Sequence, residues 1–152
     1  MIKAIFFHNY LLMLAVFGWL SAQILKTIVQ FVVSGRFSGE RLIGAGGWPS
    51  SHSALVCSLL MGVARKEGLS SPLFALSFVL AVVVMYDAMG VRRETGKQAK
   101  VINQLMDELS SDDDEGQQEE TKKLKEMVGH TPFQVLSGAL LGILLAVIIP
   151  VF

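Results

Sequence analysis

The sequence has a single cysteine and no net charge, and each shortage excludes a class of protein. Cys57 has no second cysteine to pair with, so no disulfide forms within the chain. A formal net charge of zero, from 13 basic and 13 acidic residues, gives no general attraction to nucleic acid. No group of carboxylates and histidines has the spacing of a zinc or magnesium site, so we expect neither a metal nor a cofactor.

Apolar residues are abundant instead. They make up 52% of the chain, above the roughly 45–50% typical of soluble domains. They gather in four runs, over residues 10–33, 53–68, 72–91 and 133–151, and about 20 apolar helical residues cross the roughly 30 Å hydrocarbon layer of a bilayer. The first run has no convincing signal-peptide cleavage site, so we expect it to be retained. The sequence therefore predicts one all-α domain over 1–152, a polytopic membrane bundle of about four spans.

Two segments between the third and fourth runs differ from the spans. Residues 93–109 place Val101, Ile102 and Leu105 at helical spacing among polar residues, which is typical of an amphipathic helix on the membrane surface or against the bundle. Residues 110–120 are too acidic and too poor in apolar side chains to bury a core. We expect them to form a solvated, mobile loop.

The basic residues are divided unequally between the two faces of such a bundle. The loops after the first and third runs hold nine of them, and the opposite face holds three. Short loops rich in Lys and Arg stay on the cytoplasmic side, so the count places the face with nine basic residues in the cytoplasm. Both termini lie on the opposite face and are therefore predicted to be outside. The nine are Arg36, Arg41, Arg92, Arg93, Lys97, Lys100, Lys122, Lys123 and Lys125.

Several spans carry polar residues that are costly to expose to lipid. Gln23, Lys26 and Gln30 share one helical face, which we expect to turn into the bundle; alternatively, Lys26 extends to the interface. Asp87, near the end of the third span, is a candidate functional acid; alternatively, it pairs structurally with Arg92 or Arg93.

Four features meet on the side that carries the nine basic residues: the loop before His52, the end of the third span, the start of the fourth span at His130, and the Lys26 face. Two helices begin there, and helix N-termini favour anions. With Arg92 and Arg93 nearby, we expect a phosphate site. Its histidines can divide phosphoryl transfer between a nucleophile and an acid, although a histidine at a helix start is often only a cap or an interfacial residue.

Four sequence blocks carry a resemblance to a known family. They are Gly-Gly-Trp-Pro-Ser-Ser-His-Ser-Ala over residues 46–54, Tyr-Asp-Ala-Met-Gly-Val-Arg over 86–92, Gly-Lys-Gln-Ala over 96–99, and Gly-His-Thr-Pro-Phe-Gln-Val over 129–135. Their order and spacing resemble the divergent branch of the type 2 phosphatidic acid phosphatase superfamily. That superfamily is related to acid phosphatases and vanadium-dependent haloperoxidases, and its chemistry requires no metal.

The resemblance implies roles for five residues. His52 would be the general acid, and Ser50 and Ser51 would bind phosphate, with Ser51 in place of a family glycine. His130 would be the nucleophile. Gln134 stands where the family has the aspartate that supports this nucleophile; a glutamine can orient the ring but carries no charge.

The family's arginine-containing motifs have no counterpart in the chain. The candidates to supply the missing positive charge are Lys26, Arg41, Arg92, Arg93 and Lys123. Asp87 is the candidate to supply the missing carboxylate.

These observations lead to three hypotheses. The first is a membrane phosphatase or phosphotransferase that acts on a lipid or polyprenyl phosphate through a phospho-histidine. The second is non-catalytic binding or transport of a phosphate headgroup, favoured by Gln134, and the third is a structural or assembly protein. The expected partners are the bilayer, an amphipathic phosphate and, to enclose a pocket, a second copy of the chain.

Overall fold

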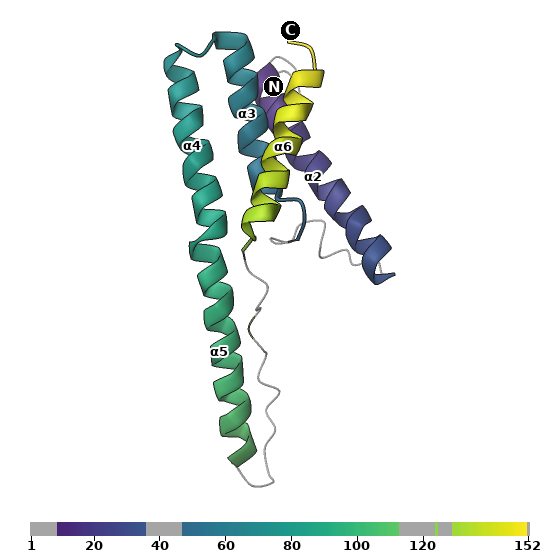
Figure 1. Ribbon diagram of the computed structural model, residues 1–152, viewed down its shortest axis with the longest axis vertical. Coiled ribbons are helices and arrows are strands. Elements are labelled where there is room, and N and C mark those ends of the chain that lie inside the picture. Colours follow the sequence, from purple (N-terminus) through teal and green to yellow (C-terminus); the bar gives the residue numbers. More distant parts are fainter. Residues whose placement is uncertain (1–8, 36–46, 113–123, 125–128, 152) are drawn as a thin grey trace, which may run out of the picture.

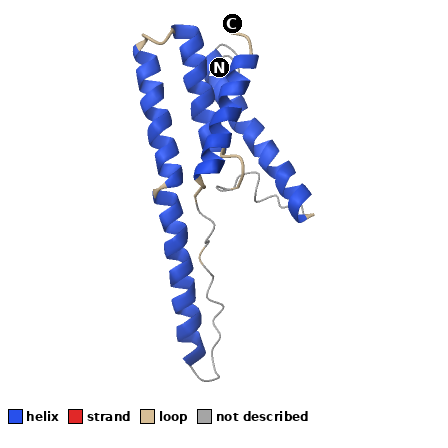
Figure 2. Cartoon of the chain, in the orientation of Figure 1, coloured by secondary structure: helices blue, strands red, loops and turns tan. Residues whose placement is uncertain are grey.

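The computed structural model describes residues 9–35, 47–112, 124 and 129–151. Within these ranges it contains helices and no strand (Figures 1 and 2). The all-α prediction is therefore confirmed. The helices are α2 (Tyr10–Ser34), α3 (Ser51–Glu67), α4 (Pro72–Met89), α5 (Val91–Asp112) and α6 (Pro132–Ile148).

Helix α3 forms the centre of the bundle and packs against α2, α4 and α6. Helix α6 packs closely against the start of α3, because a Cβ atom added at Gly138 would collide with the carbonyl oxygen of Ser50, and one at Gly142 with that of Ala54. Small residues of this kind let helix backbones approach closely. The same contact holds the start of α3 against the first half of α6.

The helices differ in how well they match a bilayer. Among the described residues, α2 and the continuous stretch Pro72–Glu108 are long and apolar enough to cross a membrane. Helix α6 is apolar but has 17 residues, as does α3, which corresponds to about 25 Å at 1.5 Å per residue. Large apolar side chains on α2, α4 and α6 point outward, as expected for a lipid-facing surface; they include Ile24, Phe31, Val79, Val83, Leu136 and Leu144.

The predicted amphipathic helix is present as α5, and among the described residues it does not pack against the bundle. It continues in the direction of α4, away from the bundle (Figure 1). The reason is that Gly90 does not interrupt the hydrogen-bond ladder: its N–H donates to the Tyr86 carbonyl at 2.8 Å, and its carbonyl accepts from Glu94 at 3.0 Å. The large apolar residues Val101, Ile102 and Leu105 of α5 are therefore exposed, whereas the small Ala99 is buried.

The acidic segment begins later than predicted. Residues 110–112 belong to α5, since extending an existing helix costs little per residue, and residues 113–120 lie outside the described part. Beyond them, the backbone N–H and C=O of Leu124 each pair with the Asn103 side chain at 2.9 Å.

Different helix ends meet at the two ends of the bundle. Helices α3 and α6 begin at the end where α4 passes into α5 (Figure 1). At the opposite end, the Arg65 guanidinium donates to the carbonyls of Ala146 and, at 2.7 Å, Ile149. A cation there stabilises the negative C-terminus of α6. The candidate site lies at the first of these ends.

Candidate phosphate site

The start of α3 is held by a cluster of buried serines. Ser50 is the N-cap, and its Oγ accepts from the Ser53 backbone N–H at 3.4 Å and from the Ser53 hydroxyl at 3.0 Å. The bond from Ala54 N–H to the Ser50 carbonyl, at 3.1 Å, opens the helix. The backbone N–H groups that precede Ala54 in the first turn make no bond to a carbonyl within the helix, so the positive end of the helix dipole lies there.

The start of α6 is closed by a capping box. The Thr131 hydroxyl accepts from the Gln134 N–H at 3.3 Å, and the Gln134 side-chain Oε1 accepts from the Thr131 N–H at 2.9 Å. Pro132 occupies the first turn, where its missing N–H costs nothing. Thr131, Pro132 and Gln134 thus each stabilise this end of the helix from a position that their residue type prefers.

Backbone bonds join these two helix starts to the end of α4. Ser50 N–H donates to the Gln134 carbonyl at 3.0 Å, and His130 N–H donates to the Ala88 carbonyl at 3.0 Å. The N-termini of α3 and α6 and the last turn of α4 therefore form one unit. This arrangement brings together Ser50 and Gln134, which are 84 positions apart in the sequence, and Ala88 and His130, which are 42 positions apart.

His52 and His130 face each other within this unit. Their ring centroids lie 6.3 Å apart, with 61° between the ring planes. His130 is buried, and its Nδ1 lies 3.4 Å from Gln134 Oε1. Because that oxygen already accepts from Thr131 N–H, it acts as an acceptor, so the Nδ1 contact requires a proton on Nδ1. The tautomer that results keeps the lone pair on Nε2.

The surroundings of His130 favour its neutral form. Burial lowers the pKa of its imidazole, and the positive charge of Lys26 lowers this pKa further. Hydrogen bonds with the Gln134 side chain and the Gly47 backbone act in the opposite direction, and the charge of His52 adds a smaller decrease. A neutral imidazole is the form able to act as a nucleophile.

Lys26 supplies positive charge at the same place. It is 2% exposed, and its Nζ donates to the Ser51 hydroxyl at 3.5 Å. Gln23 is also buried, so the prediction that this polar face of α2 turns into the bundle is confirmed, and Lys26 does not extend to the surface. Gly47, at φ 86°, lies against the Lys26 stem, where an added Cβ would approach Cγ to 3.3 Å.

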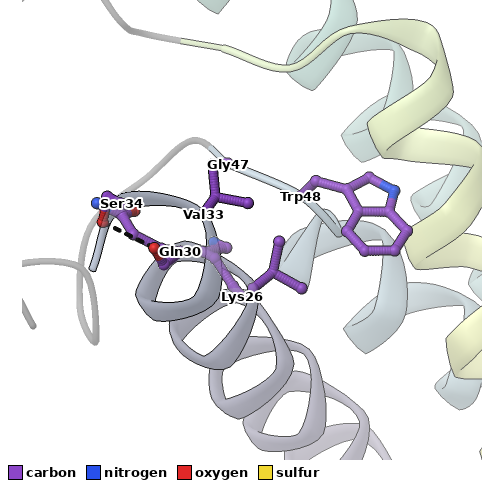
Figure 3. A pocket seen from close by; sticks show the side chains of 7 residues that line it. Lys26, Gln30, Val33, Ser34, Gly47 and Trp48 are labelled. Atoms are coloured by element: carbon purple, nitrogen blue, oxygen red, sulfur yellow. Dashed lines mark hydrogen bonds between the residues drawn. The ribbon is translucent and has the colours of Figure 1, made fainter. Parts of the chain in front are cut away.

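A pocket of about 310 Å³ lies between α2 and the loop before α3 (Figure 3). Lys26 is at one end of it, and Val29, Gln30 and Val33 follow along one face of α2. Gly47 and Trp48 form the opposite wall (Figure 3). Since Lys26 also contacts Ser51, the pocket adjoins the histidine pair through this lysine.

Comparison with known proteins identifies the family. The model described as "Divergent PAP2 family" matches residues 7–145. The chain belongs to this family. It is 42% identical over 151 residues to the uncharacterized membrane protein YuiD of Bacillus subtilis (strain 168), covering 95% of this chain and 96% of the relative. No solved structure matches it.

Membership confirms the resemblance inferred from the four sequence blocks, and the family name indicates a phosphatase-like membrane protein. In this divergent PAP2 protein, Ser50, Ser51, His52, His130 and Gln134 meet at the two helix starts. Gln134 lies beside His130, with its Oε1 3.4 Å from Nδ1 of the ring.

The remaining predicted residues lie near the end of α4 or outside the described structure. Asp87 lies in the last turn of α4, next to Ala88, whose carbonyl accepts from His130. Arg92 and Arg93 lie in the first turn of α5, and their side chains are outside the described structure. Arg41 and Lys123 are also outside the described residues.

Two aromatic residues next to the site were not predicted to have a role. The rings of Trp48 and Phe133 stack, with centroids 6.4 Å apart and 8° between their planes. Trp48 belongs to the block around His52, and Phe133 to the block around His130. The signal available in the sequence was that an aromatic residue lies three or four positions from each histidine.

Proposed function

We propose that this divergent PAP2 protein is a membrane phosphatase or phosphotransferase acting on an amphipathic phosphate, such as a lipid or polyprenyl phosphate. The observation that carries the proposal is the facing pair His52 and His130, with ring centroids 6.3 Å apart between two helix N-termini. Because both imidazoles lie at the same pair of helix starts, both can reach one phosphoryl group, one as the nucleophile and the other as the acid.

The reaction proceeds in two steps. In the first, Nε2 of neutral His130 attacks phosphorus, the N–P bond forms, and the P–O bond to the alcohol breaks while protonated His52 gives its proton to the departing oxygen. In the second, water attacks phosphorus, His52 takes a proton from it, and the N–P bond breaks to release phosphate and neutral His130. A second alcohol in place of water gives phosphotransfer.

Positive charge stabilises the phosphoryl oxygens during both steps. The first turns of α3 and α6 present backbone N–H groups and the positive ends of two dipoles. Lys26, beside Ser51 and 2% exposed, adds a cation in a low-dielectric environment. None of these groups requires a metal ion, so we expect turnover to persist in the presence of a chelator.

Gln134 favours a second candidate function. Its Oε1 is engaged in the capping box at 2.9 Å and lies 3.4 Å from His130 Nδ1, and it brings no negative charge to a phospho-histidine. A site of this kind can hold a phosphate headgroup without cleaving it. The alternative is therefore non-catalytic binding or transport of the same ligands.

The deciding experiment measures phosphate release by the purified full-length protein from a panel of lipid and polyprenyl phosphates. The variants are His130→Ala and His52→Ala, with His8→Ala as a matched control because it changes the third histidine of the chain. We expect turnover in the wild type and the control, inhibition by vanadate, persistence in EDTA, and loss in the two site variants.

Two further outcomes separate the candidates. A ³²P-labelled, acid-labile protein adduct that forms in the wild type and is missing in His130→Ala supports the covalent step. Absence of release and of adduct in well-folded wild type, together with headgroup binding that weakens in His52→Ala, would favour the binding or transport alternative.

We also propose that the site faces the cytoplasm, on the basis of the nine basic residues against three. Labelling of a cysteine introduced at Ser70, in the turn at the opposite end of the bundle, by a membrane-impermeant maleimide in intact cells tests this orientation. We expect labelling in intact cells. Labelling only after the cells are permeabilised would show that the site faces outward.

A further inference from the structure

Helices α4 and α5 form one continuous rod with a covered side and an outward side. Val83 and Val101 are 18 residues apart, which is five turns at about 3.6 residues per turn, so both lie on the same side. Ala81 and Ala99 have the same spacing and share a different side. The two valines are 58% and 55% exposed, whereas the two alanines are 1% and 7% exposed. The rod thus keeps its two sides as it passes through Gly90.

The outward side continues from the bilayer into water. The stretch Pro72–Glu108 has 37 residues, which is about 55 Å of helix, and the hydrocarbon layer is about 30 Å thick. The charged residues of this stretch are concentrated in α5, so α4 is the part inside the bilayer. Val101 and Leu105 follow Met89, the last residue of α4, by 12 and 16 residues, or about 18 and 24 Å. Because each headgroup layer adds only about 5–8 Å, lipid does not reach these two side chains.

Three large apolar side chains on α5 are therefore left in water. They are Val101, Ile102 and Leu105, and the first two border a hollow together with Lys97 and Gln98. Within the described part of the chain, the bundle lies at the other end of the rod and does not cover them (Figure 1). Removing such a surface from water stabilises an assembly, because burial of apolar area is favourable.

We propose that the outward side of α4 and α5 binds a second copy of the chain, in a symmetric dimer whose two-fold axis lies along the membrane normal. The bilayer holds a second copy at the same depth and in the same direction, so its Val101 and Leu105 meet those of the first copy. The two α5 helices then run parallel, and each covers the apolar residues of the other. This inference goes beyond the proposed reaction and does not depend on it.

The charges of α5 favour a second copy over lipid as the cover. Glu94 and Lys97 pair within the helix at 2.6 Å, so together they bring no net charge to a symmetric contact. Asp107 and Glu108 follow the apolar residues, and anionic lipid headgroups repel them. The hydrogen-bond ladder through Gly90 also keeps α5 from lying flat on the membrane.

The outward side of α4 extends the same contact inside the bilayer. Leu76, Val79 and Val83 follow it at helical spacing and are exposed. A water-soluble partner reaches α5 alone, whereas a second copy follows the whole rod. Helix α2, which lines the pocket beside Lys26, lies on the far side of α3 and α6 from α4 (Figure 1). The second copy therefore leaves this pocket open, which differs from the enclosing role expected from the sequence.

The test uses the full chain in vesicles at a low protein-to-lipid ratio. Cys57→Ala removes the native thiol, which is buried, and Val101→Cys or Leu105→Cys introduces one on the outward side. Lys100→Cys is the matched control, because Lys100 is exposed but points about 100° away from Val101 around the helix. A disulfide requires Cβ atoms within about 4.5 Å, so we expect mild oxidation to cross-link the first two variants into dimers and the control at least about tenfold less.

Charges placed at the contact provide a second measurement. Val101→Asp combined with Leu105→Asp puts like charges opposite each other in the dimer and leaves the bundle intact, because α5 stands outside it. We expect the dissociation constant of the dimer, measured by single-molecule photobleaching, to rise by at least about tenfold. Lys100→Asp changes the net charge by the same two units and should leave that constant unchanged.

A fluorophore on Leu105→Cys separates the other possible occupants. Quenching by brominated lipids without a cross-link would show that lipid covers α5 and would overturn the dimer. Monomers that neither cross-link nor respond to brominated lipids would also overturn it, in favour of a different protein partner. None of these readouts requires phosphate release, so this inference and the proposed reaction stand or fail separately.

Discussion

The side-chain oxygen of Gln134 lies 3.4 Å from Nδ1 of His130. The same atom accepts the Thr131 N–H at 2.9 Å and so closes the capping box of α6. One amide oxygen therefore stabilises the start of a helix and sets the tautomer of the candidate nucleophile. Helix geometry produces this double role, since the residue before the N-cap and the third helical residue are on the same side of the first turn.

Replacing Gln134 tests how much the absence of a carboxylate at this position limits the rate of phosphate release. Gln134→Glu preserves the reach to Thr131 and His130 and adds a carboxylate, which makes stronger, charge-assisted hydrogen bonds. We expect phosphate release to rise about tenfold, equivalent to about 1.4 kcal/mol in the barrier. Steady-state kinetics with a lipid phosphate measures the change.

Gln134→Leu is the paired substitution in the opposite direction. It removes the hydrogen bond to His130, worth about 1–3 kcal/mol, so we expect turnover to fall by about tenfold to a hundredfold. Equal turnover in the Glu and Leu variants would show that this position does not support the nucleophile.

The lowered pKa of His130 predicts how kcat/KM depends on pH. Burial and the charge of Lys26 hold this pKa below the ordinary value of 6.5, so the neutral, reactive imidazole persists through pH 6.5. We expect kcat/KM to decline as the pH falls through the lowered pKa. In Lys26→Met the nearby positive charge is lost, the pKa of His130 rises, and the acidic limb moves to higher pH.

Lys66→Met provides the control for that shift. Lys66 lies at the far end of α3, over the Tyr10 ring, and its removal changes the charge of the chain equally. An acidic limb that stays in place in Lys26→Met, or that moves equally in Lys66→Met, would contradict the assignment of the limb to His130.

The helix contact at Gly138 positions the loop that contains Ser50. A methyl group in Gly138→Ala would collide with the Ser50 carbonyl, and overpacking of this kind costs about 1–3 kcal/mol. We expect a lower thermal unfolding temperature and a raised KM, because α3 and α6 move apart at the site. Leu140→Ala, at an exposed position of the same helix, should leave KM unchanged.

At the opposite end, Arg65 contributes to stability without contributing to the reaction. Arg65→Met removes the hydrogen bonds to the carbonyls of Ala146 and Ile149, and bonds to charged groups are worth about 1.5–3 kcal/mol each. We expect a lower unfolding temperature in detergent and unchanged turnover per folded molecule. A variant as stable as Lys66→Met would argue against this role for Arg65.

Asn103 holds the backbone of Leu124 against α5 through two bonds of 2.9 Å. Asn103→Leu removes both, so we expect the Leu124 amide to exchange with solvent about tenfold faster, equivalent to about 1.4 kcal/mol of lost protection. Hydrogen exchange with mass spectrometry measures this. Gln104→Ala, at an exposed neighbouring position, should not alter the exchange.

The sequence by itself determined the helices, the inward polar face of α2 and the residues of the histidine blocks. Helical segments follow from apolar content and from caps such as Ser50 and Thr131, which act over three or four residues. The expectation that the Lys26 face turns into the bundle followed from the cost of a charge facing lipid, and the burial of Lys26 in the structure decided against the alternative of an interfacial lysine. Family membership followed from short blocks whose order is visible in the sequence alone.

Only the tertiary structure decided the relations between distant segments. The 6.3 Å separation of His52 and His130 depends on α3 and α6 packing through Gly138, and the Lys26 to Ser51 contact depends on how α2 lies against α3. The direction of α5 depends on whether the ladder continues through Gly90. Sequence periodicity specifies which face of a helix is apolar, but packing determines which residues that face meets, because contacts between helices depend on shape across the whole bundle.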